Sequence, residues 1–269
     1  MTDRFLQDKA ALVTGSTQGI GLAIAEALGG AGCRVAIHGL GDAATIESAE
    51  TAVRDAGAAE VRFFNADLRD PGAIGSMMRE AAEWGGVDIL VNNAGVQKTT
   101  SLEDADTETW NAVITVNLSA AFHTMRLAMP AMGERGYGRV INIASVHGLV
   151  ASREKAPYVA SKFGLVGMSR VAALEYAALG DRASGGVTVN CICPGWTETS
   201  LIEPQIEART QQVGGGRTEG IADLLREKQP SLRMSDPMEI GALAVWLCHR
   251  HAHNITGTSV PVDGGWTAQ

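Results

Sequence analysis

Three residues near the middle of the sequence have the types and spacing of a proton-transfer site. Tyr158 precedes Lys162 by four residues, and Ser145 ends the apolar run RVINIAS thirteen residues before the tyrosine. Residues four apart on a helix share a face. A tyrosine pKa of about 10 is too high for a base at neutral pH, and a neighbouring ammonium group would lower it. We therefore expect Tyr158 to exchange a proton with an alcohol or carbonyl oxygen, to which Ser145 donates a hydrogen bond. The alternative is an ordinary surface helix that follows a loop.

A glycine-rich segment, TGSTQGIG at 14–21, follows the first apolar run and opens a helical pattern. Gly15 would permit a tight turn, while Gly19 and Gly21 would let backbone and helix approach a pyrophosphate closely. This pattern predicts a dinucleotide site, and a plain strand–helix turn is the alternative. The second apolar run ends in HGLGDAAT, without the arginine or lysine that a 2′-phosphate requires. We therefore expect NAD. Asp42 stands late in that turn and can instead cap the next helix.

Apolar runs that alternate with helical patterns would position these residues. The runs are rich in Val and Ile and end in turn residues, as buried strands do; they span 10–15, 34–39, 61–67, 87–95, 139–145, 187–195 and 258–265. This repetition predicts an α/β fold, a doubly wound parallel sheet with helices on both faces. Ligands of such sheets bind beyond the carboxyl ends of the strands.

We expect a single domain over residues 1–269, because no internal repeat or low-complexity tract divides the chain. Helix starts are marked as well: Asp70 is a candidate N-cap, with Pro71 at the first helical position. The long polar segment 196–236 does not fit the alternation. Since structureless loops of such length are uncommon in compact domains, we expect a mobile substrate lid with short helices there.

Composition narrows the partners and the location. The net charge of −8 and pI of about 5.3 argue against a nucleic-acid partner. No apolar run of about 18 residues predicts a membrane span, and the N-terminus lacks a signal-peptide pattern. We therefore expect no membrane association and a cytoplasmic location. The four cysteines, Cys33, Cys191, Cys193 and Cys248, are expected to be buried, reduced thiols.

Taken in order, the glycine loop, NNAG at 92–95, Ser145 and YVASK at 158–162 resemble the classical short-chain dehydrogenase/reductase family. The likeness runs from about residue 8 to VDGGW near the end. It implies a single Rossmann-type domain with seven parallel strands, assembled as a homotetramer. The family's catalytic set matches Asn117, Ser145, Tyr158 and Lys162, in which Asn117 would hold a water that relays protons outward. Lys162 would also reach the ribose hydroxyls.

The same resemblance assigns a set of cofactor contacts. In the glycine loop these are Gly15, Thr17, Gly19, Ile20 and Gly21. Asp67 and Leu68 match the adenine-contacting segment, and Asn93 matches the residue beside the adenine ribose. In PGWTET, Thr197 and Thr199 would lie over the nicotinamide, where Thr197 replaces the usual valine. Tyr158 and Lys162 complete the expected cofactor set.

Several further phrases, among them HGLVAS, EKQPSL and DGGW, resemble bacterial members of the family that act on D-3-hydroxybutyrate. The resemblance implies that Gln97, His147, Lys155 and Gln205 hold a small carboxylate, with Ser145 and Tyr158 at the reacting oxygen and Trp196 and Trp266 as aromatic walls. One cation with several neutral donors suits a single negative charge. The predicted reaction is the NAD-dependent interconversion of D-3-hydroxybutyrate, a small hydroxy acid, and its ketone acetoacetate.

Other interpretations remain open at this point. The substrate could be another small polar alcohol or ketone, such as a polyol, a sugar or a 3-ketoacyl compound. A catalytically silent NAD-binding regulator is a second class, although such a protein has no need of the tyrosine hydroxyl. Lys155 could be a solvated loop lysine. In HRHAH at 249–253, His249 and His253 would share a helix face, but we expect no metal site there.

Overall fold

The computed structural model describes residues 4–268 and contains a seven-stranded parallel sheet. The strand order is β3-β2-β1-β4-β5-β6-β7, and every neighbouring pair is parallel. The strands are β1 Ala10–Val13, β2 Arg34–Ile37, β3 Glu60–Phe63, β4 Ile89–Asn92, β5 Tyr137–Ile143, β6 Gly186–Pro194 and β7 Ser259–Val262. The chain reverses direction across the sheet between β1 and β4, which is where such folds bind ligands.

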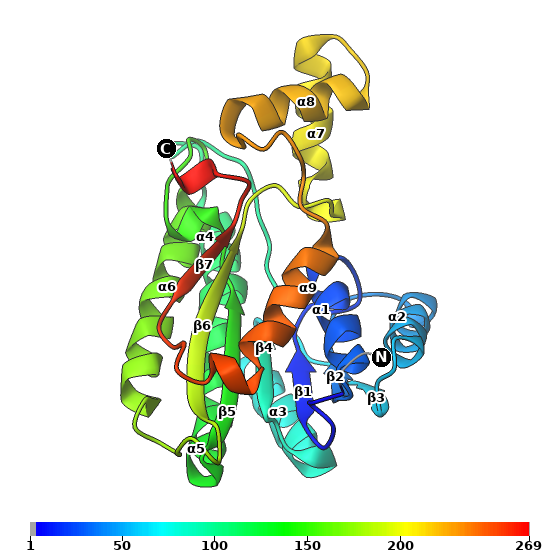
Figure 1. Ribbon diagram of the computed structural model, residues 1–269. Coiled ribbons are helices and arrows are strands. Elements are labelled where there is room, and N and C mark those ends of the chain that lie inside the picture. The colour runs from blue at the N-terminus through cyan, green and yellow to red at the C-terminus, as the bar shows by residue number, and fades with distance from the viewer. Residues whose placement is uncertain (1–3, 269) are drawn as a thin grey trace.

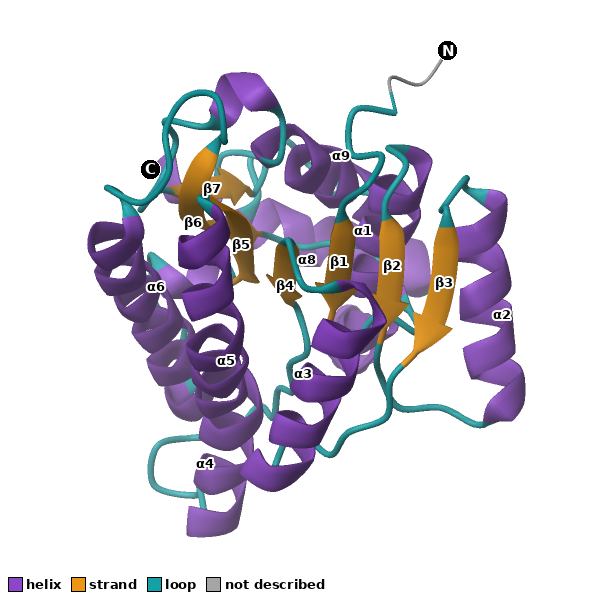
Figure 2. Ribbon diagram, turned by 90° about the horizontal axis from the view of Figure 1, so that it is seen from below, coloured by secondary structure: helices purple, strands orange, loops and turns teal. Residues whose placement is uncertain are grey.

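Helices cover both faces of the sheet, as Figure 2 shows in the view along the layers. One layer holds α1 (Gly19–Gly30), α2 (Ala43–Asp55) and α9 (Pro237–Leu247). The other holds α3 (Pro71–Gly85), α4 (Thr107–Ile114), α5 (Ala120–Arg135) and α6 (Ala156–Tyr176). A π-helical turn, Thr115–Ser119, joins α4 to α5. The predicted doubly wound α/β architecture with seven parallel strands is thus confirmed.

Local sequence signals explain where the helices begin. Asp70 caps α3 through a hydrogen bond from the Gly72 N–H at 2.7 Å, and Pro71 is the first helical residue. Asp42 caps α2 by accepting from the Thr45 N–H at 2.8 Å. The carboxylate of Asp42 is therefore engaged at a helix start, as the lateness of this residue after β2 suggested.

Apolar side chains fill the space on either side of the sheet. On one side, β1, β2 and β4 pack against α1 and α9, and on the other side the same sheet packs against α3 and α5. The four cysteines are buried and free of disulfides, as predicted. No helix among residues 4–268 is long and apolar enough to cross a membrane.

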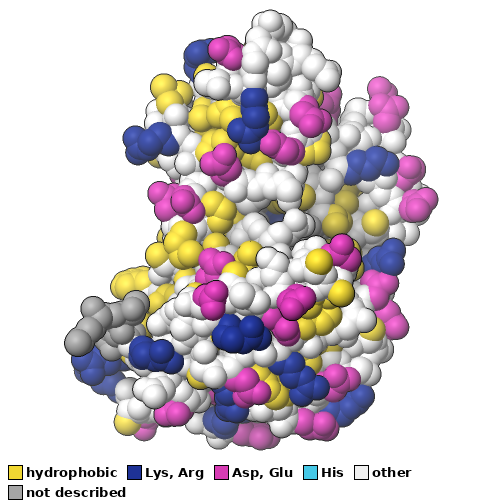
Figure 3. Space-filling view, turned by 90° about the vertical axis from the view of Figure 1, so that its right-hand side faces the viewer, with side chains coloured by type: hydrophobic (Ala, Val, Ile, Leu, Met, Phe, Trp, Pro, Cys, Tyr) yellow, Lys and Arg dark blue, Asp and Glu magenta, His cyan; other side chains and the backbone are white. Residues whose placement is uncertain are grey.

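The segment after β6 rises above the carboxyl edge of the sheet (Figure 1). It contains a short 3₁₀ turn, Ser200–Ile202, and two helices, α7 (Glu203–Val213) and α8 (Arg217–Lys228), that pack on each other. Arg209 on α7 donates to Asp223 on α8 at 2.9 Å and also pairs with Glu227. The predicted short helices are present, and we call residues 196–236 the lid. Figure 3 shows a hollow in the surface between the lid and the sheet domain.

The histidine-rich segment differs from its expected geometry. Helix α9 ends at Leu247, and residues 250–252 form a separate 3₁₀ turn that His249 caps. His249 and His253 therefore do not share a helix face, because the helix has already ended before them. His249 instead packs edge-on against Phe5, with ring centroids 4.9 Å apart.

Candidate active site

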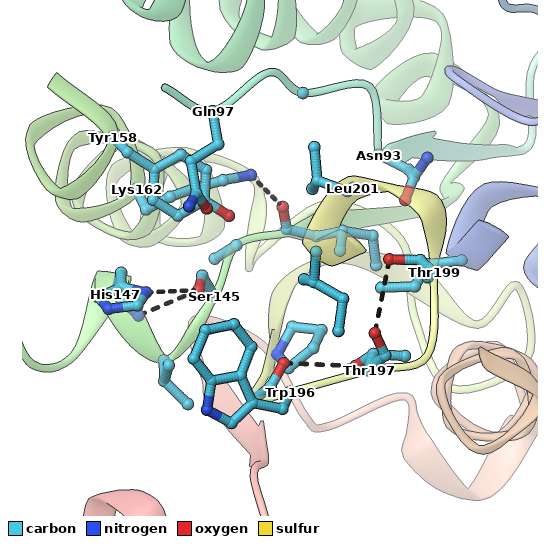
Figure 4. A pocket seen from close by; sticks show the side chains of 18 of the residues that line it. Asn93, Gln97, Ser145, His147, Tyr158, Lys162, Trp196, Thr197, Thr199 and Leu201 are labelled. Atoms are coloured by element: carbon cyan, nitrogen blue, oxygen red, sulfur yellow. Dashed lines mark hydrogen bonds between the residues drawn. The ribbon is translucent and has the colours of Figure 1, made fainter. Parts of the chain in front are cut away.

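One cavity lies where the ends of β4, β5 and β6 meet the start of α1, the start of α6 and the lid. Figure 4 shows the side chains that point into it. Among its lining residues are many of those singled out from the sequence: Ile20, Asn93, Gln97, Ser145, His147, Lys155, Tyr158, Lys162, Trp196, Thr197, Thr199 and Trp266. Gln205, on α7, lines an adjoining cavity that shares Gln97, Lys155, Trp196 and Trp266 with the first. Residues far apart in the chain are thus gathered at one sheet edge.

The glycine loop is shaped by close backbone contacts. Gly15 has φ +64°, a conformation that favours glycine. A Cβ on Gly21 would lie 2.1 Å from the Gly15 carbonyl oxygen, so that position excludes any side chain. The Asn93 amide donates to the carbonyl oxygens of Thr14 and Gly15 at 3.0 and 2.9 Å. Asn93 therefore braces the loop in addition to lining the cavity.

A histidine at the end of β2, which the sequence analysis did not identify, also contacts the glycine loop. His38 is buried; its Nδ1 accepts from the Gly15 N–H at 3.3 Å, and its Nε2 faces the Ala66 carbonyl at 3.0 Å. Burial lowers the pKa of His38, so the ring is neutral with its proton on Nε2. Thr17 donates to the Leu40 carbonyl at 2.9 Å and fastens the same turn.

The side chains of Asp67 and Leu68, which were predicted to contact the adenine, are engaged with other residues of the protein. Asp67 forms a two-pronged pair with Arg69, with Nε to Oδ1 at 3.0 Å and Nη2 to Oδ2 at 2.7 Å. The hydrogen bonds from Arg69 lower the pKa of Asp67 to about 2. Leu68 is buried in the core beside Leu90, and it lines a small cavity with Asn92 and Ala94. The structure does not bring Asp67 into the main cavity.

Asn117 lies in the π-helical turn, a feature that is frequent at functional sites. Its Oδ1 accepts from the Val96 N–H at 2.8 Å, while Nδ2 donates to the Val96 carbonyl at 3.0 Å and to Ser161 at 3.2 Å. The side-chain amide is thus fully engaged in holding the loop that follows β4. The predicted water-holding role would fall to another atom of this residue.

Tyr158 and Lys162 share a face of α6, as predicted, with the lysine Nζ 5.6 Å from the tyrosine ring centroid. The direction of the tyrosine pKa is the opposite of our expectation. Burial raises the pKa of Tyr158 to about 12, and the Ser145 hydroxyl opposes this only in part. The Lys162 ammonium, which donates to the Ile143 carbonyl at 2.8 Å, does not outweigh the effect of burial on the Tyr158 pKa. Burial also lowers the pKa of Lys162 to about 8. In this structure the Tyr158 hydroxyl is therefore protonated at neutral pH.

The predicted carboxylate site contains a buried cation. Lys155 is 8% exposed, and its Nζ lies 5.2 Å from the centroid of the Trp196 ring. No carboxylate within residues 4–268 lies at salt-bridge distance from it. Burial, helped by the charge of Lys228, lowers the pKa of Lys155 to about 8. A buried lysine at a cavity wall is suited to receive an anion.

Two glutamines from different parts of the chain meet beside that lysine. With the Gln205 amide nitrogen donating to the Ile202 carbonyl at 2.9 Å, its oxygen accepts from Gln97 Nε2 at 2.5 Å. Gln97 follows β4 and Gln205 belongs to α7, so this contact joins the lid to the sheet domain. The binding of a carboxylate by Gln205 stays a prediction, and the structure adds that Gln205 lies beside Gln97.

His147 lies in the cavity with both ring nitrogens engaged. Nδ1 lies 3.4 Å from the Ser145 hydroxyl (Figure 4), and Nε2 lies 2.8 Å from the Ser152 hydroxyl. The ring is edge-on to both Tyr158 and Trp266. Burial, reinforced by Lys155 and Lys228, lowers the pKa of His147 to about 3. The ring is therefore neutral, and in this structure it contacts serine hydroxyls.

The base of the lid lies against the glycine loop. A Cβ on Gly19 would lie 3.4 Å from Thr199 Cγ2, and Thr197 forms a single bridge with Ser235 where the lid returns. The Trp196 N–H donates to the buried Gln229 side chain at 2.9 Å. The rings of Trp196 and Trp266 lie 5.7 Å apart. These contacts fix both indoles at the cavity wall.

A nicotinamide dinucleotide fits the residues present. Gln18 at the N-cap of α1 makes no side-chain capping bond, so side-chain capping leaves the first N–H groups of the helix free for a pyrophosphate. The space above the loop depends on glycines where a Cβ would be excluded. The same cavity extends from Ile20, at the start of α1, to Tyr158 and Lys162 on α6.

Comparison with known proteins agrees with this geometry. A family model described as short chain dehydrogenase matches residues 9–210. The chain therefore belongs to this family, and it is an oxidoreductase that uses a nicotinamide cofactor.

Individual members of the family resemble this chain over nearly its whole length. It is 47% identical to D-beta-hydroxybutyrate dehydrogenase of Cupriavidus necator, over 98% of this chain and 100% of the relative. It is 44% identical to the enzyme of the same name from Rhizobium meliloti, over 97% and 99% of the two chains. Among solved structures, a variant of actinorhodin polyketide ketoreductase with NADPH superposes with a TM-score of 0.88, at 33% identity over 97% and 98% of the chains.

Proposed function

We propose that this enzyme interconverts D-3-hydroxybutyrate and acetoacetate with NAD. The observation that carries the proposal is the buried ammonium of Lys155, which has no carboxylate at salt-bridge distance among residues 4–268 and lines the same cavity as Tyr158 and Ser145. A polyol or sugar offers no charge to match that ammonium, whereas a short hydroxy acid does. The full-length similarity to two enzymes named D-beta-hydroxybutyrate dehydrogenase supports the same substrate.

The position of each residue in the cavity suggests its role in substrate binding or proton transfer. Lys155, Gln97 and Gln205 hold the carboxylate, and Trp196 and Trp266 close a small apolar space around the short chain. Ser145 donates a hydrogen bond to the reacting oxygen. Tyr158 gives that oxygen a proton during ketone reduction and takes it back during alcohol oxidation. When bound, the nicotinamide cofactor supplies or accepts the hydride.

The preference for NAD rests on the end of β2. A 2′-phosphate there would find no arginine or lysine between His38 and Thr45. His38 is neutral with both ring nitrogens engaged, and Asp42 caps α2 with its carboxylate. A phosphate dianion beside Asp42 would meet a like charge without a compensating cation. We therefore propose NAD over NADP. We also propose the homotetramer that the family resemblance implies.

The direct test is the appearance of NADH absorbance with D-3-hydroxybutyrate and NAD, with L-3-hydroxybutyrate and NADP as controls. Turnover with the D acid and NAD alone supports the substrate, the stereochemistry and the cofactor together. Absence of turnover with the D acid would contradict the proposal. The cavity would then serve another polar substrate, and polyols and 3-ketoacyl compounds would be assayed next.

A further inference from the structure

A chain of side-chain contacts links the lid to the serine that faces the reacting oxygen. Lys228, the last residue of α8, donates from Nζ to the Ser152 hydroxyl at 3.0 Å. Ser152 lies 2.8 Å from His147 Nε2, and His147 Nδ1 lies 3.4 Å from the Ser145 hydroxyl. Three of the four residues lie within positions 145–152 and the fourth lies on α8, so one of the contacts spans 76 positions of sequence.

The donor and acceptor capacities of the four groups set the direction of each hydrogen bond in this series. The Lys228 ammonium can only donate, so Ser152 accepts from it and has its own hydrogen available for His147 Nε2. Nδ1 then carries the ring proton and points it at Ser145. The Ser145 oxygen also accepts from the His147 backbone N–H at 3.1 Å. With its oxygen accepting twice, the serine directs its own hydrogen away from His147, toward Tyr158 and the place of the substrate oxygen.

The opposite arrangement would disable the serine. If Nε2 carried the ring proton, Nδ1 would become an acceptor beside Ser145 and would take the hydroxyl hydrogen that the substrate oxygen needs. A neutral ring can adopt either state, and the low pKa of His147 shows that the ring is neutral. The Lys228 ammonium beyond Ser152 favours the state in which the Nε2 lone pair faces Ser152 and the ring proton lies on Nδ1.

We infer that Lys228 is a positioning residue for the proposed reaction, which orients the Ser145 hydroxyl through Ser152 and His147 when the lid is seated. The inference rests on the proposed function only for the identity of the substrate. Two further contacts hold the Lys228 side chain in place. Its Nζ lies 5.5 Å from the Trp266 ring centroid and 3.7 Å from a Glu227 oxygen. When α8 is displaced, Ser152 loses its donor and the serine loses its fixed orientation.

The test compares Lys228→Met with Arg226→Met, a matched control two residues earlier on α8. Arg226 is exposed and pairs only with Asp223, at 3.2 Å, among the described residues. We expect Lys228→Met to lower kcat about tenfold or more with KM changed less than about twofold. Arg226→Met should behave as the parent enzyme, and Lys228→Arg should recover most of the rate. NADH binding should be equal in all variants, which shows that they are folded.

Two further measurements distinguish positioning from direct binding. Ser152→Ala should lose as much rate as Lys228→Met, and the double variant should lose no more than either single one. Additive losses would overturn the inference. A rise in KM at unchanged kcat would also overturn it, because Lys228 would then bind the substrate carboxylate itself.

The last readout does not depend on the substrate. Ring ¹⁵N chemical shifts of His147 should show a protonated Nδ1 in the parent enzyme and a mixture of tautomers in Lys228→Met. A parent enzyme with the proton on Nε2 overturns the inference whatever the kinetics show. If the ring shifts agree but D-3-hydroxybutyrate is not turned over, the proposed substrate fails and the positioning role stands.

Discussion

At the scale of single residues, Lys155 makes substrate binding dependent on pH. Its pKa of about 8 lies below the ordinary lysine value because the ammonium is buried. The group is charged below that pH and becomes neutral as the pH rises through it, so carboxylate affinity is lost on the alkaline side. We expect the Kd of acetoacetate for the enzyme–NADH complex to rise about tenfold between about pH 7 and about pH 9. NADH fluorescence in the Tyr158→Phe variant would measure this without turnover.

Lys155→Arg is the control for that experiment, since arginine stays protonated over the whole range. Its Kd should be independent of pH even where its absolute affinity differs. If the alkaline loss persists in Lys155→Arg, the titrating group is another one, such as Lys162, whose pKa is also about 8.

Tyr158 carries the second prediction at this scale. Replacing it with phenylalanine keeps the buried ring and its edge-on contact with His147 but removes the proton donor. Turnover should fall by a factor of about 10² or more, while NADH binding stays nearly unchanged. Steady-state kinetics and NADH titration would measure both. Turnover retained at the parent rate would show that another group transfers the proton.

Sequence reasoning identified the groups at the reacting oxygen better than it identified their supports. Ser145, Tyr158 and Lys162 are marked by their spacing, and they do line one cavity. His38, Ser152 and Lys228 carry no such mark, because each matters only through a partner that the fold brings near. The pKa of Tyr158 was predicted in the wrong direction because spacing reveals a neighbouring charge but not the extent of burial.

At the scale of elements, the glycine loop depends on the absence of one side chain. Gly21→Ala would place Cβ 2.1 Å from the Gly15 carbonyl oxygen and 2.4 Å from Asn93 Nδ2. The backbone must shift to relieve this, so we expect a loss of about 1–3 kcal/mol in the free energy of unfolding and weaker NADH binding. Urea denaturation and fluorescence titration would measure the two effects.

Gly75→Ala in α3 is the matched control, because a Cβ there meets nothing within 4 Å. It should stabilise the protein by about 0.4–1 kcal/mol through the lower entropy of the unfolded chain. NADH binding should not change. Equal behaviour of the two variants would mean that the loop adapts to a side chain at position 21.

The elements themselves were largely predictable, for a physical reason. Buried parallel strands need short runs of Val and Ile, and helix starts need caps such as Asp70, so both leave local traces in the sequence. The lid is different. Helices α7 and α8 have few buried residues and are joined by the ion pairs of Arg209, so their sequence is polar and has little periodicity. Their presence could be inferred from the length of the segment, and their packing could not.

At the scale of the whole molecule, one outer face exposes a stripe of apolar side chains to solvent. Phe163, Val171 and Leu174 lie on one face of α6, and Leu174 is 81% exposed. A Cβ on Gly167 in the same stripe would meet nothing within 4 Å. Phe122 on the neighbouring helix α5 is exposed as well. Exposed apolar side chains that gather on a surface are typical of an interface, and we propose that a second copy of the chain covers this stripe.

The proposed homotetramer can therefore be tested at that stripe. Light scattering should give about four times 28.1 kDa for the parent protein. Leu174→Asp would bury a charge without a partner in the interface, so the mass should fall toward that of a dimer or monomer. Leu102→Asp is the matched control, because Leu102 is 80% exposed in the loop after β4 and does not belong to the exposed face of α6. Only a mass that falls for Leu174→Asp and holds for Leu102→Asp places the interface on α6. A monomeric parent protein would contradict the tetramer, and an unchanged Leu174→Asp tetramer would move the interface to another face.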